Sequence, residues 1–455
     1  MNEPPQQPAE HDPLAALRQW PFILYSLNRV GATIGQAMFQ TVLMWQVYDI
    51  TGSAFSLGLL GLVRFFPSLA TSLIGGAVAD AYDRRVVMIV AKIIPFSCGV
   101  ILAVATLGDW VSLGLILGLS VFMGIAMAFE GPARIALLPA IVRAETFENA
   151  VTVSNTMQKL AMVVGPTIAG LVIAVAGAGA GYMVFCASVV IALVPLLLLR
   201  YAPSSGPRQR VSVAAIKEGV AFVMKRQVLL GAMALDMFAV IFGGAQALLP
   251  VYAADVLHVG PTGFGVLSSS MQIGAFSMAA IMVMRQPVVS TGRVLIYSVV
   301  VYGLLTVAFG ASTFYVLSIL LYGLIGAADQ VSVVMRQTTI QMATPDELRG
   351  RVSSVNQVFV GASGQIGGMR AGFVAAVAGP VFAVVSGGIG AVLVAALIAW
   401  KMPQLFNYEI KRGGVVIPNP EADIDQTALL MPQPDGQEPA SKEREAAEAV
   451  TAQRS

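Results

Sequence analysis

Charged side chains are scarce in this sequence. Asp, Glu, Lys and Arg make up 11% of its 455 residues, whereas a soluble domain carries about 25%. Apolar residues reach 56%, and the formal net charge is only +2. This composition excludes an ordinary soluble protein, argues against nucleic acid as a partner, and predicts an integral membrane protein.

Cysteine and histidine are also rare. Cys98 and Cys186 both lie inside apolar runs, so we expect small packing residues rather than a disulfide framework. His11 and His258 lie outside the predicted membrane spans, and neither is a credible metal ligand alone. The phosphate-binding pattern G-x-x-x-x-G-K-[ST] and the zinc pattern H-E-x-x-H are absent. We therefore expect no enzyme activity, no metal and no cofactor.

Long apolar runs, by contrast, are abundant. Each is long enough to cross a hydrocarbon core of ~30 Å as a helix. The sequence thus predicts an all-α integral membrane protein with twelve transmembrane helices, at 22–49, 55–80, 86–107, 111–131, 146–175, 180–200, 228–252, 262–284, 292–311, 314–336, 348–376 and 380–402.

Basic residues collect in alternate connections between these spans. Six intervening loops, around 50–54, 106–112, 175–182, 253–262, 309–315 and 376–381, contain none. Because basic loops stay on the cytoplasmic side, we predict a multi-pass protein of the inner (plasma) membrane with both termini cytoplasmic. The fifteen basic residues of the other connections are Arg84, Arg85, Arg134, Arg143, Arg200, Arg208, Arg210, Lys217, Lys225, Arg226, Arg285, Arg293, Arg336, Arg349 and Arg351.

The chain also contains an internal repeat. GPTIAG at 165–170 recurs as GGMRAG at 367–372, and Arg134 and Arg336 are separated by the same shift of 202 residues. Asn155 and Asn356 match at a shift of 201. A nearly constant offset predicts two pseudo-symmetric six-helix halves with a binding site between them.

Five regions follow from these patterns. The segment between the halves places Val213, Ile216 and Val220 on one helical face, which indicates an amphipathic linker. The last fifty residues are too polar to order themselves. The predicted regions are a cytoplasmic tail over 1–20, a first half over 21–200, the linker over 201–227, a second half over 228–402 and a disordered cytoplasmic tail over 403–455.

The densest charge cluster, GGAVADAYDRRVVM at 75–88, connects the second and third spans. It resembles the loop signature of the major facilitator superfamily, G-x-L-a-D-r-x-G-r-k, although Ala81 and Asp83 replace the usual basic residue and glycine. LVRFFPSLATSLIGGAVADAYDRR, FEGPARIALLPAIV and TPDELRGRV look like the branch of that superfamily that holds the enterobactin exporter and related drug exporters. The resemblance covers about residues 20–402.

That resemblance implies a gate on the cytoplasmic side. Asp80 would face the start of the eleventh helix, near DELRGRV, and Arg84 would pair with Glu130 at the end of the fourth span. Arg85 is explained more simply as a membrane anchor. The predicted gating residues are Gly76, Asp80, Arg84, Arg85 and Glu130.

Polar residues inside spans are costly, so they are candidates for a cavity, although each amide can instead join helix to helix. Arg64 has no acid nearby in sequence, so it needs either a partner from another helix or an anionic group of the substrate. The predicted cavity residues are Arg29, Gln36, Gln40, Arg64, Asn155, Gln158, Gln330 and Asn356.

Asp329 and Asp236 are the candidates for proton coupling, because a carboxyl group can take up and release a proton as its surroundings alternate. Gly323 and Gly326 favour Asp329 by leaving room beside it. The alternatives are a structural pair between Asp329 and Arg336, and an interfacial position for Asp236.

These features predict a secondary transporter that exports a small amphiphilic, siderophore- or drug-like compound in exchange for protons by alternating access. Its expected partners are that small molecule, protons and the bilayer, and it is expected to be monomeric. Uptake, lysophospholipid transport and a non-transporting sensor or scaffold remain alternatives, since fold does not determine function.

Overall fold

The computed structural model describes residues 15–200, 213–284, 289–345 and 348–410. Within these ranges the chain is helical and forms no β-strand. Nine helices of the described part are long and apolar enough to cross a membrane. The apolar runs of the sequence therefore form long helices, as predicted.

The first half contains five long helical segments, α1 to α5, in the part of the chain that the structure describes. The 52-residue α5 is in fact two helices, because Gly177 interrupts it with a φ of 79° and a ψ of 173°, a conformation that glycine adopts readily. Short 3-10 turns, η1 (Ala15–Arg18) and η2 (Ala144–Thr146), precede α1 and α5. The long helices are α1 (Trp20–Thr51), α2 (Ala54–Ala81), α3 (Arg84–Leu107), α4 (Leu113–Ile141) and α5 (Phe147–Leu198).

The second half begins after a linker helix, α6 (Val213–Lys225), which packs on α12 through an ion pair between Glu218 and Arg351. The predicted seventh span ends early as α7 and continues as short turns, η3 (Ala245–Leu248), α8 (Leu249–Val251) and η4 (Tyr252–Val256). The remaining helices are α7 (Gln227–Gly243), α9 (Gly260–Met284), α10 (Thr291–Ala311), α11 (Tyr315–Met342), α12 (Arg349–Ala378), α13 (Pro380–Lys401) and α14 (Pro403–Phe406).

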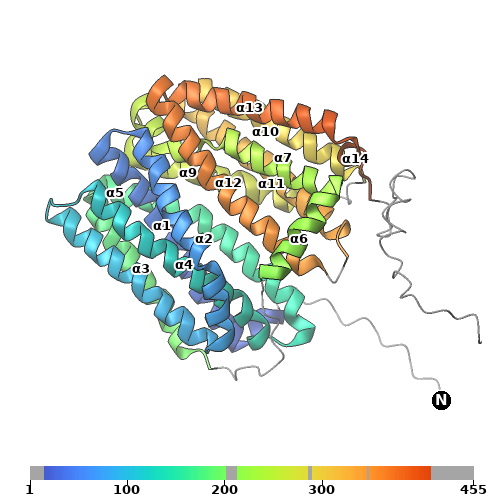
Figure 1. Cartoon of the computed structure of the whole chain (residues 1–455). Coiled ribbons are helices and arrows are strands. Elements are labelled where there is room, and N and C mark those ends of the chain that lie inside the picture. The colour runs from blue at the N-terminus through green and yellow to red at the C-terminus, as the bar shows by residue number, and fades with distance from the viewer. Residues whose placement is uncertain (1–14, 201–212, 285–288, 346–347, 411–455) are drawn as a thin grey trace, which may run out of the picture. The chain divides into compact units, whose positions relative to one another are not determined.

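Two helix crossings join the halves, α5 with α9 and α2 with α12 (Figure 1). At the first, a Cβ on Gly170 would lie 2.9 Å from Cα of Gly265; at the second, a Cβ on Gly372 would lie 3.2 Å from Cα of Gly58. Gly170 and Gly372 are equivalent in the internal repeat. The repeated glycines thus let the helices of the two halves approach closely at two equivalent places.

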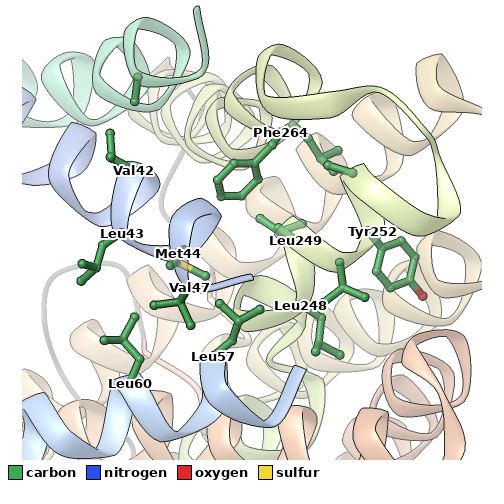
Figure 2. Close-up of a cluster of buried hydrophobic side chains, with 14 of the residues drawn as sticks. Val42, Leu43, Met44, Val47, Leu57, Leu60, Leu248, Leu249, Tyr252 and Phe264 are labelled. Carbon is green, nitrogen blue, oxygen red and sulfur yellow. The ribbon is translucent and has the colours of Figure 1, made fainter. Parts of the chain in front are cut away.

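The two sides of the helical assembly differ. We call the side where α2 ends and α3 begins, beside Arg84 and Arg85, the basic face, and the side with the turns at Gly52, Gly177 and Gly379 the neutral face. Toward the neutral face the halves meet in a cluster that we call the apolar seal. Figure 2 shows side chains of α1 and α2 gathered there against those of η3 and α8; the seal consists of Met44, Val47, Leu57, Leu248 and Leu249.

Two further contacts lie beside the seal. The Tyr48 hydroxyl donates a hydrogen bond to Oδ2 of Asp255, and the rings of Trp45 and Phe264 stack with centroids 5.9 Å apart. Each contact pairs a residue of α1 with a residue of the second half. The neutral side is therefore closed by both packing and hydrogen bonding.

Candidate transport cavity

A cavity of about 2060 Å³ lies between the halves. Its lining runs from Ala81, the last residue of α2 on the basic face, to Met44, Leu57 and Leu249 of the apolar seal. Both halves contribute side chains to it. Drug-sized ligands occupy pockets of about 300–1,000 Å³, so this cavity has room for a bulky compound together with water.

Half of the predicted cavity residues line this space. Gln36 and Gln40 come from α1, Arg64 from α2 and Gln158 from α5. The other four, Arg29, Asn155, Gln330 and Asn356, do not line it. Their positions follow from the polar contacts they make.

Arg29 ties α1 to α5 inside the first half. Its guanidinium donates to Oγ of Ser154 at 2.5 Å, to Oδ1 of Asn155 at 3.0 Å and to Oε1 of Gln158. All three acceptors are neutral. Arg29 and Asn155 thus act in helix-to-helix hydrogen bonding, the alternative role that amides in spans often have.

The second half holds a buried ionic cluster. Nη1 of Arg336 lies 2.7 Å from Oδ2 of Asp236 and donates to Oδ1 of Asn356 at 3.3 Å. The three residues belong to α11, α7 and α12, and each is at most 5% exposed. Asp236 is therefore not interfacial, and the partner of Arg336 is Asp236 rather than Asp329.

Asp329 lines the cavity. Lys159 of α5 donates from Nζ to Oε1 of the adjacent Gln330 at 2.8 Å and acts electrostatically on the Asp329 carboxylate. This contact crosses from the first half to the second at about mid-helix. An acid, a base and an amide from both halves thus meet beside the cavity.

Gly323 and Gly326 do not provide the space beside Asp329 that the sequence predicted. A Cβ on Gly326 would clash with the carbonyl of Met271, and Gly323 meets the backbone of α9 through Gly274. These glycines serve the close packing of α11 on α9. Space at Asp329 comes from the cavity itself.

The predicted gate is only partly described. Arg84 donates to the carbonyl of Ala136 at 2.7 Å, and Arg85 donates to the carbonyls of Leu196, at 2.8 Å, and Leu197. Both arginines therefore tie the start of α3 to α4 and α5 within one half. The Asp80 side chain and the surroundings of Gly76 lie outside the described part of the structure.

The predicted ion pair between Arg84 and Glu130 was wrong. Glu130 pairs with Lys92, with Nζ and Oε1 2.8 Å apart. The reason is depth, since Glu130 lies eleven residues, about 16 Å, before the end of α4 at Ile141. Both members of the pair line the cavity. Lys92 escaped notice in the sequence, although a lone lysine inside VVMIVAKIIPF already violates the apolar pattern of a span.

Known proteins resemble this chain over most of its length. The family model described as transmembrane secretion effector matches residues 11–424. The enterobactin exporter EntS of Citrobacter koseri is 24% identical over 401 residues, which cover 84% of this chain and 89% of the relative. EntS of Escherichia coli O1:K1 has the same identity and coverage.

One solved structure shows the same fold. A POT family transporter in complex with 5-aminolevulinic acid superposes with a TM-score of 0.65 at 12% sequence identity, covering 84% of this chain and 96% of that chain. At this identity the match concerns the fold alone. With the family match over residues 11–424, the chain belongs to the transmembrane secretion effector family of the major facilitator superfamily of membrane transporters.

Proposed function

We propose that this protein is a secondary exporter that alternates access between two faces of the inner membrane by rocking its two halves. The observation that carries this proposal is the cavity, which reaches the basic face and ends at the apolar seal. A site open to one face and closed to the other is the arrangement that alternating access requires. The names of the EntS relatives favour export as the direction.

The membrane topology in this proposal has twelve crossings. The break at Gly177 makes two crossings of α5, and α1 and α12, with 32 and 30 residues, are long enough to span. These additions bring the nine apolar helices to twelve. The basic face is cytoplasmic, since basic connections are retained there, so the cavity faces the cytoplasm and both termini lie on that side.

Protons supply the energy in this proposal, and Asp329 carries them. Its carboxyl lines the cavity and has Lys159 close by, whereas Asp236 is occupied by Arg336. The exported compound is a small amphiphile of the siderophore or drug kind, and the transporting unit is a monomer. Uptake would use the same cavity in the opposite direction.

Inside-out membrane vesicles test this proposal. Energised vesicles that contain the protein are expected to accumulate enterobactin or a member of a panel of fluorescent amphiphiles of both charge signs, and a protonophore is expected to abolish the accumulation. Membrane vesicles from cells that lack the protein are the control. Accumulation only in right-side-out vesicles would establish uptake instead, and no protein-dependent movement in either orientation would overturn a transport function.

A further inference from the structure

The charges of the cavity wall are unevenly distributed. Of the residues that the structure describes, three basic and two acidic side chains line it, namely Arg64, Lys92, Arg134, Glu130 and Asp329. Glu130 is already engaged by Lys92, and Asp329 belongs to the opposite half with Lys159 nearby. Among the described side chains, the first-half wall therefore presents Arg64 and Arg134 without a carboxylate paired to either.

Arg64 is the deeper of these two arginines. It lies in the middle of α2, and its Nη1 donates to Oε1 of Gln40 while its Nη2 contacts Sδ of Met127 at 3.5 Å. Both acceptors are neutral, and no acidic side chain of the described chain lies within ion-pair distance of Arg64. A permanently charged guanidinium at this depth normally pairs with an acid. Since the described residues supply none, a bound anion can provide the counter-charge.

The other residues of the cavity wall indicate the chemistry of the remaining part of the ligand. Phe65 and Leu69, on the same helix as Arg64, and Met162 of α5 line the cavity, and Gln36 adds an amide. Apolar walls with a few placed polar groups hold ligands that are apolar over most of their surface. Methionine adapts to ligands of varied shape.

We propose that Arg64 is the anchor of an anion-binding subsite, so that the compound carried by this cavity is an amphiphilic anion whose carboxylate, phenolate or phosphate binds the Arg64 guanidinium. The planar fork of an arginine suits such groups, because it can donate two parallel hydrogen bonds. Arg134, seven residues beyond Met127 on α4 and closer to the basic face, attracts the same ligand into the cavity. This inference rests on the proposed transport function and names the substrate class for it.

Charge-selective labelling tests the subsite directly. Ser68 lies one helical turn from Arg64 on α2 and also lines the cavity, so Ser68→Cys introduces a reactive group beside the guanidinium. The purified protein in lipid nanodiscs is labelled with methanethiosulfonates that carry either a sulfonate or a trimethylammonium group, and the rates at position 68 are read by peptide mass spectrometry. We expect Arg64→Gln to lower the ratio of anionic to cationic labelling by about tenfold.

Matched variants separate charge from fold. Arg64→Lys is expected to keep most of the ratio, and Arg293→Gln, which removes a charge outside the cavity beside Glu409, is expected to keep all of it. The small neutral methyl methanethiosulfonate reports whether position 68 remains accessible in each variant. An unchanged ratio in Arg64→Gln with normal neutral labelling would overturn the inference.

Protection by model ligands provides the second arm. Benzoate and benzamide have the same shape, but only benzoate carries a charge. Benzoate is expected to slow labelling at position 68 more than benzamide does, and Arg64→Gln is expected to remove that difference. Equal protection by both compounds in the unchanged Arg64 background would overturn the anionic class.

The lipid composition distinguishes the two sources of such an anion. In nanodiscs of phosphatidylcholine alone, benzoate protection is expected to persist. If phosphatidylglycerol itself protects position 68 and abolishes the benzoate effect, the site holds a lipid headgroup, and the assignment to an exported compound is overturned. The vesicle experiment remains an independent test. If the vesicles accumulate a substrate but labelling does not depend on Arg64, only this inference is overturned. If the labelling ratio depends on Arg64 but nothing is transported, only the proposed function is overturned.

Discussion

The two halves use equivalent positions in different ways. In the second half, Arg336 is buried against Asp236 and Asn356. In the first half the residue aligned with Arg336 is Arg134, which lines the cavity and makes no hydrogen bond or ion pair with the described residues. One member of the repeated pair is buried in an ion pair, and the other lines the cavity.

A single position explains this divergence. Near the start of each half the repeat has a shift of 208 residues, which matches Asp236 with Asn28. The Asn28 amide donates to the carbonyl of Ala192 at 2.5 Å. An amide cannot neutralise an arginine, so within the described part of the chain Arg134 has no counterpart of the second-half ion pair. Among the described residues, the first-half wall thus carries three basic side chains and one acidic one, whereas the second half offers Asp329. A cavity divided in this way suits an anionic ligand on one wall and a proton on the other.

The largest expected effect tests the structural side of this comparison. Arg336→Ala would leave Asp236 buried without its partner, and breaking a buried pair in this way costs about 3–5 kcal/mol. Arg134→Ala removes the equivalent arginine from a partly exposed site and is expected to change stability by no more than about 0.5 kcal/mol. Thermal unfolding of the detergent-solubilised protein, followed by intrinsic fluorescence, measures both.

The double variant Asp236→Asn/Arg336→Gln controls for the pair itself, because it removes both charges together. It is expected to recover part of the stability lost in Arg336→Ala. Equal unfolding temperatures for Arg336→Ala and Arg134→Ala would mean that the halves do not differ at this position.

A smaller effect is expected when the acidic side of the cavity is neutralised. One-for-one exchange with protons converts a pH difference of one unit into about a tenfold concentration ratio, or about 1.4 kcal/mol. Asp329→Asn is expected to lose this gradient-driven accumulation while retaining downhill exchange of substrate between the two sides of a vesicle. Asp236→Asn is the matched control, and its expected defect is in stability rather than in coupling. Normal accumulation by Asp329→Asn would assign coupling to another group.

Much of the fold could be predicted from local patterns. A helix in lipid must hide its backbone and present apolar side chains over its whole length, so hydropathy alone locates most of the helices. The glycines at 177 and 379 adopt positive φ values at the expected turns. The early end of α7 at Gly243 was not predicted, because the 3-10 and π-helical turns that follow remain as apolar as a span.

The partners of buried charges were harder to predict than the helices. The partner of Arg336 depends on the rotation and depth of α7, which is a hundred residues away in sequence. The sequence of the spans next to Arg336 determines neither the rotation nor the depth of α7. Glu130 was expected at a helix end and lies about three turns inside one, where Lys92 reaches it. The closure of the neutral side was missed for the same reason, since Tyr48 and Asp255 each look like ordinary loop-end residues.

The smallest expected effect concerns this closure of the neutral side, where the two halves contact each other. Tyr48→Phe removes one hydroxyl and its hydrogen bond to Asp255, and leaves the packing of Trp45 on Phe264 in place. A hydrogen bond of this kind contributes about 1 kcal/mol, so the ratio of neutral-side-open to neutral-side-closed molecules should rise roughly fivefold. Spin labels at Thr51 and His258 report the two populations as a distance distribution in nanodiscs.

Tyr82→Phe is the matched control, because that hydroxyl is exposed on the basic face and its loss should leave the distribution unchanged. If Tyr48→Phe also leaves the distribution unchanged, the apolar seal alone holds the neutral side closed. If the open population rises as expected, the hydrogen bond is one of the contacts that set the balance between the two states. Because the seal is apolar and has little directionality, a directional bond beside it is the element best suited to break in one step in the proposed rocking of the halves.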